Sequence, residues 1–355
     1  MKPASLAAIQ TDLLRQVVAV AGAVFLVGIG LFLGHGAWSG AATRRNAARL
    51  AQGQTALQSV LDGSGTAAHH RRLAALPRRL RIHVLVAVAS SLAGEQRQRL
   101  TELAADVGLL GWAEARCRSR LWWRRLHGAR LCTLLGGGAE AVPTLLRDRR
   151  PEVRAQAAHW VVEHHNDDLV DLLLRMLDVD DASSRFSVQD SLIRIGRPLL
   201  DRLASHLSVR SGPSLAPALE VAVAVADPVL LPAALSLCDD AAAGIRSLAA
   251  ALAGAIGGGA AVEALTGLLA DEAPDVRAAA ARALGRAGNW PSAGALARLL
   301  GDPSWDVRLQ AAVALRSLGS PGTLFLRQAL SGGDIHAAEA ARHMLELPAS
   351  AVRTL

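Results

Sequence analysis

The stretch DEAPDVRAAAARALGRAG at residues 271–288 is followed by DPSWDVRLQAAVALRSLG at residues 302–319, 31 positions further along the chain. Both begin with Asp, carry Asp-Val-Arg four positions later, and share two alanines, a leucine and a closing glycine in one register. An arginine recurs in this register at spacings of 31, 61, 31 and 31 residues: Arg154, Arg185, Arg246, Arg277 and Arg308. A period near 31 without strand-like alternation predicts stacked helical hairpins.

Each repeat has the pattern of two short helices. In AVEALTGLL at residues 261–269, apolar side chains lie three and four positions apart, as on one face of a helix. Pro274 fits the first turn of a second helix, and Gly288 can take the left-handed conformation that ends it. Alanines three and four positions after the arginine let stacked helices approach closely: Ala157, Ala158, Ala249, Ala250, Ala280, Ala281, Ala311 and Ala312.

An aspartate precedes the arginine by six positions in four of the repeats: Asp148, Asp240, Asp271 and Asp302. Stacking brings like units into line, so each arginine is expected to reach an aspartate or a turn carbonyl of a neighbouring repeat. Because the pair recurs regularly, it indicates a structural ladder rather than a single active site.

The repeated segments PEVRAQAA (151–158), PDVRAAAARALG (274–285) and WDVRLQAAVALRSLG (305–319) resemble HEAT repeats, especially the bacterial HEAT-like form also found in phycobilisome lyases. The resemblance covers about residues 120–345. It implies an α-solenoid, and most HEAT proteins act as scaffolds or binding surfaces while a minority are enzymes.

An uncharged, apolar stretch precedes the repeats at residues 17–38. Its 22 residues make a helix of about 33 Å, which is enough to cross a hydrocarbon core of about 30 Å. A cleaved signal peptide is the competing interpretation, but the long apolar run and the poor cleavage site before Ser39 argue against it. Arg44, Arg45 and Arg49 follow the stretch, which predicts a single-pass inner-membrane protein with its C-terminal part in the cytoplasm.

The predicted fold is all-α, an α-solenoid of stacked HEAT-like hairpins preceded by one transmembrane helix. Charge divides the chain unevenly: residues 1–130 hold 18 Lys/Arg and 6 Asp/Glu, whereas residues 131–355 hold 20 and 25. Cys117, Cys132 and Cys238 are odd in number and far apart in sequence, which indicates a reducing compartment without a disulfide framework. The predicted segments are an N-terminal segment (1–16), the transmembrane helix (17–38), a juxtamembrane helix and linker (39–70), a divergent helical region (71–120), HEAT-like repeats (121–348) and a tail (349–355).

Recognisable catalytic motifs do not occur in the sequence: it has no GxSxG, Walker A, GxGxxG or HExxH. The His-Glu pairs that bind iron in deoxyhypusine hydroxylase, another HEAT protein, are missing as well. Glu163, His164 and His165 form a local cluster of metal-capable residues, but adjacent histidines at a helix end diverge, so a polar loop is the preferred interpretation. We predict no catalytic, metal-binding or cofactor-binding residue, although a site assembled from distant repeats stays open.

The most unusual segment is RCRSRLWWRRLHGAR at residues 116–130. Three hypotheses stay open for it: an atypical first repeat whose tryptophans cover the solenoid end, contact with an acidic protein or anionic lipid, and nucleic-acid binding. The acidic distal repeats and the membrane span argue against nucleic acid. The candidate partner or lipid contacts are Arg116, Arg118, Arg120, Trp122, Trp123, Arg124 and Arg125.

Taken together, these features favour a non-catalytic, membrane-anchored scaffold that binds a protein partner, such as a membrane enzyme, at the cytoplasmic face of a bacterial inner membrane. The alternatives are a lyase or oxidoreductase on the HEAT-like fold, and a nucleic-acid-binding protein. The sequence does not indicate the partner's identity or the oligomeric state.

Overall fold

The computed structural model describes residues 46–178, 182–209 and 212–348. Over these ranges the chain consists of helices joined by short turns and contains no strand, which confirms the all-α prediction for them. In the same ranges no helix is both long and apolar enough to cross a membrane. The predicted transmembrane helix (17–38), the segment before it and the tail (349–355) lie outside the described residues.

The chain divides into two compact units. Among the described residues, the first unit contains 46–113 together with 134–137, and the second contains 114–133 and those from 138 to 348. The border after residue 113 therefore lies earlier than the predicted start of the repeats at residue 121. The reason is local: the turn at Ser119 and Arg120 holds a side chain of the following helix, Arg125, as the turns of the later repeats do.

The first unit is built around a leucine-rich core. Leu57 and Leu61 lie in this core beside Leu73 and Leu85, so residues 46–61 form a packed helix of the unit. The sequence predicted a juxtamembrane helix and linker at 39–70, and residues 46–61 of that range are helical and pack into this core. The other helices of this part are α2 (Ala67–Ala75), α3 (Arg78–Ala89), α4 (Gly94–Asp106) and α5 (Leu109–Cys117), whose last residues belong to the second unit.

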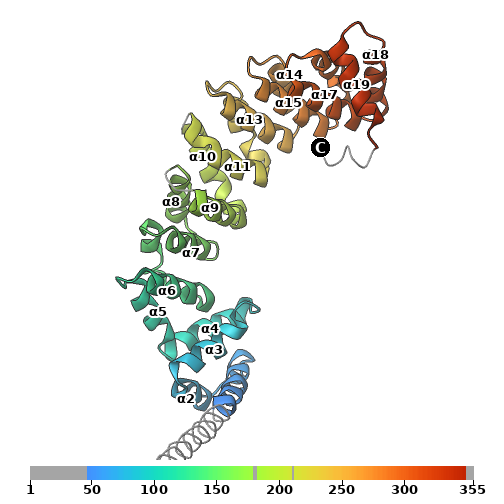
Figure 1. Cartoon of the computed structure of the whole chain (residues 1–355). Helices are drawn as coiled ribbons and strands as arrows, with labels where there is room; N and C mark the ends of the chain where they lie inside the picture. Colours follow the sequence, from blue (N-terminus) through green and yellow to red (C-terminus); the bar gives the residue numbers. More distant parts are fainter. Residues whose placement is uncertain (1–45, 179–181, 210–211, 349–355) are drawn as a thin grey trace, which may run out of the picture. The chain divides into compact units, whose positions relative to one another are not determined.

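The second unit is a two-layer stack of helical hairpins (Figure 1). In one layer, each helix contacts the next: α7 (Pro151–Val161), α9 (Ala182–Ile195), α11 (Ala216–Val225), α13 (Ala243–Ile256), α15 (Pro274–Arg286) and α17 (Trp305–Ser317). In the other, each helix packs against the one that follows it in the chain: α8 (Asp167–Leu177), α10 (Leu200–Val209), α12 (Leu231–Leu237), α14 (Gly259–Leu268), α16 (Ala293–Arg298) and α18 (Ser320–Leu330). This pairing confirms the predicted hairpins.

Further helices complete the second unit. The helix α6 (Trp122–Leu135) precedes the stack in sequence, and α19 (Ile335–Glu346) packs against both α17 and α18 at its C-terminal end. Short 3-10 turns connect several elements: η1 (Pro143–Arg147), η2 (Arg197–Leu199), η3 (Pro213–Leu215), η4 (Pro228–Leu230), η5 (Trp290–Ser292) and η6 (Leu299–Gly301).

Small residues set the spacing between the stacked helices. The eight alanines that follow the repeat arginines are all at most 1% exposed. Gly285 adds a closer contact, because a Cβ atom on it would lie 2.6 Å from the Cα atom of Ala314 on α17. Gly254 lies 31 positions earlier on α13, and a Cβ atom on it would lie 2.4 Å from the Cβ atom of Ala283 on α15. Alanine and glycine at these positions are therefore the reason why the repeats stack tightly.

Candidate functional site

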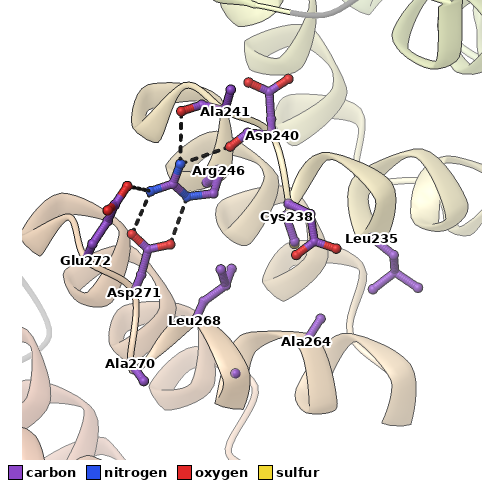
Figure 2. Close-up of a pocket in the computed structure, with 12 residues that line it drawn as sticks. Leu235, Cys238, Asp240, Ala241, Arg246, Ala264, Leu268, Ala270, Asp271 and Glu272 are labelled. Carbon is purple, nitrogen blue, oxygen red and sulfur yellow. Dashed lines mark hydrogen bonds and ion pairs between the residues drawn. The ribbon is translucent and has the colours of Figure 1, made fainter.

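The arginine of a well-formed repeat binds its own turn and the turn of the next repeat. Arg246 donates from Nη1 to the main-chain oxygens of Asp240 at 2.9 Å and Ala241 at 3.2 Å (Figure 2). Its Nε and Nη2 donate to the two carboxylate oxygens of Asp271, both at 2.8 Å. The same carboxylate accepts the N–H of Ala273 at 2.8 Å. One guanidinium group thus joins two repeats through a bidentate, charge-assisted contact.

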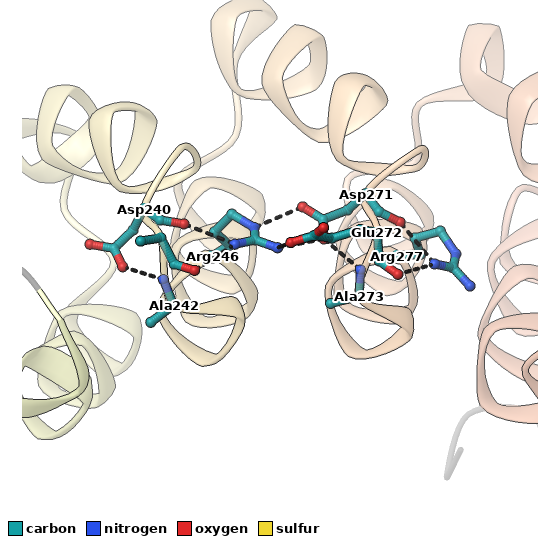
Figure 3. A network of polar contacts seen from close by, with 8 residues as sticks. Asp240, Ala242, Arg246, Asp271, Glu272, Ala273 and Arg277 are labelled. Atoms are coloured by element: carbon teal, nitrogen blue, oxygen red, sulfur yellow. Dashed lines mark hydrogen bonds and ion pairs between the residues drawn. The ribbon is translucent and has the colours of Figure 1, made fainter.

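Arg277 repeats this geometry one repeat later. Its Nη1 donates to the main-chain oxygen of Asp271 at 2.8 Å (Figure 3), and its Nε and Nη2 donate to the Asp302 carboxylate at 2.8 and 2.9 Å. Each aspartate therefore acts twice: its carbonyl holds the arginine of its own repeat, and its carboxylate holds the arginine of the preceding one. We call this arrangement the Asp–Arg ladder.

The ladder pairs stay ionised at neutral pH. The hydrogen bond from Arg246 holds the pKa of Asp271 below its usual value. Burial alone would raise the pKa of Asp302, but hydrogen bonds from Arg277 and from the N–H of Ser304 bring it below the usual value too. The pKa of Arg277 is raised by its hydrogen bond with Asp302. Groups whose pKa values are moved away from neutrality are poorly suited to proton transfer, so this geometry suits a structural role.

We call each arginine of the ladder, together with its acceptors, a rung. The first rung contains Arg125, which the sequence predicts to be a partner or lipid contact. Its Nε and Nη2 donate to the carboxylate of Asp148, with Nη2 at 2.8 Å from Oδ1. Its Nη1 donates to the main-chain oxygens of Ser119 and Arg120, both at 3.1 Å. The side chain is thus part of the ladder, and its contact with a partner or lipid stays a prediction. The sequence obscured its place in the ladder because this turn has no aspartate and Asp148 follows at a spacing of 23 rather than 25.

The remaining predicted ladder residues keep only part of the pattern. Arg154 donates to the main-chain oxygen of Asp148 at 2.9 Å and to the hydroxyl of Ser184 at 3.1 Å. Arg185 lies half-buried on α9. Asp240 accepts the N–H of Ala242 at 2.8 Å, but the residue 25 positions before it is leucine. The degenerate repeat around α11 has therefore kept its helix and lost its arginine.

The last rung is open. Arg308 donates from Nη1 to the main-chain oxygens of Asp302 at 2.6 Å and Pro303 at 3.0 Å. In the described part of the chain, its solvent-shielded Nε has no hydrogen-bond acceptor. The next capping aspartate, Asp334, follows Asp302 by 32 positions instead of 31, and its carboxylate accepts the N–H groups of residues 336 and 337.

A surface hollow of about 710 Å³ lies beside the Arg246 rung (Figure 2). Its wall includes the thiol of Cys238 and the carboxylates of Asp239, Asp240 and Glu272. Burial, with a smaller effect of Asp239, raises the pKa of Cys238 to about 11. The thiol is therefore protonated at neutral pH and is not an activated nucleophile.

Exposed tryptophans and arginines meet at the start of the second unit. Trp122 and Trp123 are 38% and 48% exposed. The guanidinium carbons of Arg116 and Arg124 lie 5.6 and 5.1 Å from the ring centroid of Trp123, and that of Arg150 lies 5.7 Å from Trp122. We call these five residues the Arg–Trp surface. Sequence reasoning missed Arg150, which lies one residue before α7.

Positive charge at the Arg–Trp surface is only partly compensated. Residues 114–154 contain ten arginines and four acidic residues, a net of +6. Burial and repulsion from Arg124 lower the pKa of Arg116. An anionic group bound here would relieve that repulsion, and the exposed rings would supply apolar contact. Arg118 and Arg120, the other predicted contacts, are exposed in the same basic segment between α5 and α6.

Two cysteines that are far apart in the sequence lie together in the second unit. A side-chain hydrogen bond with Cys132 lowers the pKa of Cys117, while the same bond and burial raise the pKa of Cys132. Both are buried, unbridged thiols. This pair could not be predicted from the sequence, because it depends on how α5 and α6 pack.

The Glu-His-His segment does not converge on a common point. The ring of His164 stacks on Trp160 with centroids 4.3 Å apart, and its Nδ1 lies 3.1 Å from the main-chain oxygen of Trp160. The Nδ1 of His165 lies 3.0 Å from the main-chain oxygen of Val162. Within residues 46–178, 182–209 and 212–348, no three His, Cys, Asp or Glu side chains lie close enough together to hold one metal ion.

A protein-family model recognises the C-terminal repeats. Residues 262–346 match the HEAT repeat family. The match begins in α14 and ends with α19, so it includes the Arg277 rung and the open Arg308 rung. No curated protein sequence matches the chain significantly.

Similar solved structures are helical and distant in sequence. They include an engineered protein with 17% identity, covering 83% of this chain and 98% of that chain, at a TM-score of 0.37. Importin beta is 13% identical and covers 82% of this chain and 47% of its own, at a TM-score of 0.48. Human deoxyhypusine hydroxylase is 17% identical and covers 77% and 97%, at a TM-score of 0.30. At these values the similarity carries no argument about activity or partners.

Proposed function

We propose that this chain is a non-catalytic HEAT-repeat scaffold, anchored in a bacterial inner membrane, that holds an acidic protein partner at the cytoplasmic face. The Arg–Trp surface is the proposed docking site. The observation that carries the proposal is the pair of exposed tryptophan rings beneath guanidinium groups in a segment with a net charge of +6. Tryptophan and arginine are the residues most enriched at the energetic centres of protein interfaces.

The chemistry of the surface favours a protein over a nucleic acid. Guanidinium groups lie over both Trp122 and Trp123, which leaves less of each ring for stacking with a base. The basic segment is also followed by an acidic one, because residues 155–355 contain 16 Lys/Arg and 22 Asp/Glu. Phosphate backbones would be repelled along that length. A partner with a local acidic and apolar patch fits both features.

The Asp–Arg ladder supports the scaffold part of the proposal. Bidentate contacts join α13 to the turn before α15, and α15 to the turn before α17. Such links keep successive repeats in a fixed register, which a docking platform needs. The membrane part rests on the uncharged stretch at residues 17–38 and on the arginines that follow it.

Site-specific cross-linking in cells tests the docking site. A photoreactive amino acid replaces Trp123 in the full-length chain, and a matched variant carries it at Phe186, which is 72% exposed on α9. We expect a discrete cross-link from position 123 to a protein with an acidic surface, and none from position 186. The cross-link should disappear when Arg118, Arg120 and Arg124 are changed to Glu, but persist when the exposed Arg298 is changed to Glu.

Two further measurements test nucleic acid and anionic lipid as alternative ligands of the Arg–Trp surface. The full-length chain in detergent is mixed with single-stranded DNA, and a version reconstituted in neutral lipid is mixed with phosphatidylglycerol vesicles. Binding of either that is lost in the triple Glu variant, together with no protein cross-link from position 123, would replace the protein partner by nucleic acid or lipid. Cross-links of equal yield from positions 123 and 186 would also overturn the proposal.

A further inference from the structure

The open rung at Arg308 has the geometry of a carboxylate site without its carboxylate. At Arg277, Nη1 donates to the carbonyl oxygens of Asp271 and Glu272, while Nε and Nη2 donate to the carboxylate of Asp302. At Arg308 the turn carbonyls hold Nη1 in the same way, at 2.6 and 3.0 Å. The Nε atom is shielded from solvent and, among the residues the structure describes, has no acceptor. The turn carbonyls thus fix Nη1 as they do at Arg277, and a ligand carboxylate reaches Nε by displacing the atoms that cover it.

The helix that carries the open rung also differs at its first residue. α13 begins with Ala243 and α15 with Pro274, whereas α17 begins with Trp305. The Trp305 ring is 48% exposed, and the guanidinium carbon of Arg308 lies 5.4 Å from its centroid. Among the rungs of α13, α15 and α17, the large exposed aromatic side chain therefore occurs at the one whose arginine has no carboxylate acceptor.

We propose that Arg308 and Trp305 form a second docking site, which binds an Asp or Glu carboxylate of a protein partner next to an apolar side chain. The carboxylate takes the place that Asp302 has on Arg277, and the apolar side chain packs on Trp305. A bidentate carboxylate is the ligand that matches the Nε and Nη2 edge of arginine. This site lies on α17, whereas the Arg–Trp surface lies on α6 and its neighbouring turns, so the inference goes beyond the proposed function.

The chain's own nearest candidate for the rung is Asp334. Its Oδ1 accepts the N–H groups of His336 and Ala337 at 2.9 and 3.2 Å, where it caps α19. Gly332 and Gly333 precede it, and the extra position takes it out of the 31-residue register. Asp302 accepts the N–H of Ser304, the residue before α17, and binds Arg277 simultaneously, whereas Asp334 is the N-cap residue of α19.

Ligand-observed NMR on the full-length chain in mild detergent tests the site. The probes are an acetylated Gly-Asp-Leu-Gly amide and its Asn counterpart. We expect the Asp peptide to bind with a dissociation constant on the order of 1 mM and the Asn peptide to bind about tenfold more weakly. Arg308→Gln and Arg308→Lys should each weaken binding of the Asp peptide about tenfold. Lys keeps the positive charge but lacks the planar pair of N–H donors that binds a carboxylate. Arg327→Gln, which removes an exposed charge from α18, should leave binding unchanged.

Several outcomes would overturn the proposal. They are no saturable binding of the Asp peptide up to about 10 mM, equal binding of the Asp and Asn peptides, or equal losses in the Arg308 and Arg327 variants. Binding seen only after Asp334→Asn would show that the chain fills its own rung, which also contradicts it. Because Arg308→Gln leaves the cross-link from position 123 untouched, failure here is distinguishable from failure of the proposed function.

Discussion

Arginine at the ladder position makes contacts that lysine cannot reproduce. Arg277 uses three nitrogens at once: Nη1 on two turn carbonyls, and Nε and Nη2 on the carboxylate of Asp302. Both side chains are largely buried, at 13% and 5% exposed. A single ammonium group has no planar fork to satisfy both sets of acceptors. The residue type is therefore fixed by hydrogen-bond geometry as well as by charge.

Arg277→Lys is predicted to destabilise the second unit nearly as much as Arg277→Gln. Each variant should lower the free energy of unfolding by about 2 kcal/mol, because the buried carboxylate loses its bidentate partner. Denaturant unfolding measures the change. Arg202→Gln, which removes solvent-accessible pairs with Asp167 and Asp171, serves as the control and should change the free energy of unfolding by less than about 1 kcal/mol. A Lys variant as stable as the original chain would contradict the geometric argument.

The ladder should also make the protein sensitive to acid. The folded-state pKa values of Asp271 and Asp302 lie below the ordinary aspartate value. Their contribution to stability is therefore fully present above the unfolded pKa of about 3.9 and is lost as pH falls through the lower folded values. We expect Asp302→Asn to be less stable at pH 7 and to lose less stability between about pH 5 and 3. If the free energy of unfolding of the original chain and of Asp302→Asn changed with pH in the same way, this prediction would be wrong.

At the scale of the helix, close approach depends on missing side-chain atoms. The Gly285 and Ala314 contact between α15 and α17 leaves no room for a Cβ atom, and Ser317 adds a hydrogen bond from its hydroxyl to the Gly285 carbonyl at 3.1 Å. Gly254 and Ala283 repeat the close contact between α13 and α15. These contacts recur 31 residues apart, at the period of the repeat, so they are a regular feature of how the helices of this unit stack.

Gly285→Val is predicted to push α15 and α17 apart and to lower the free energy of unfolding by about 1–3 kcal/mol. Thermal and denaturant unfolding measure the loss. The matched control is Gly267→Ala on α14, where an added Cβ meets no atom within 4 Å. That change should be neutral or stabilising by up to about 1 kcal/mol, because alanine favours the helix. If both glycine variants behaved alike, close stacking would not be the cause.

The sequence predicted the repeated hairpins because a 31-residue period is a local, countable signal. It did not reveal whether Arg246 would bind the carboxylate of Asp240, six positions before it, or that of Asp271, 25 positions after it. That choice depends on the direction in which repeats stack. The place of Arg125 in the ladder was not predicted because its aspartate comes at an irregular spacing. The packing of the helix at 46–61 was not predicted because no repeat marks the first unit. The contact between Cys117 and Cys132 likewise arises only from tertiary packing.

At the scale of the whole molecule, charge is separated along the chain. Residues 1–130 hold 18 Lys/Arg against 6 Asp/Glu, while residues 131–355 hold 20 against 25. A basic segment near an anionic leaflet is attracted to it, and an acidic segment is not. If residues 17–38 span a membrane, as proposed, the basic part of the chain is the part that follows the span directly. This charge distribution also leaves the Arg–Trp surface as the basic region nearest to the acidic repeats in sequence.

Retention of residues 17–38 in the mature protein is the prediction on which membrane placement rests. The full chain should stay in the membrane pellet after carbonate extraction, with an intact mass that includes those residues, and a variant that begins at residue 39 should be soluble. A C-terminal reporter that is active only in the cytoplasm should be active on the full chain. A mature chain that begins near Ser39 and is found outside the cytoplasm would instead identify the stretch as a signal peptide, and the partner would then have to be sought on the other side of the membrane.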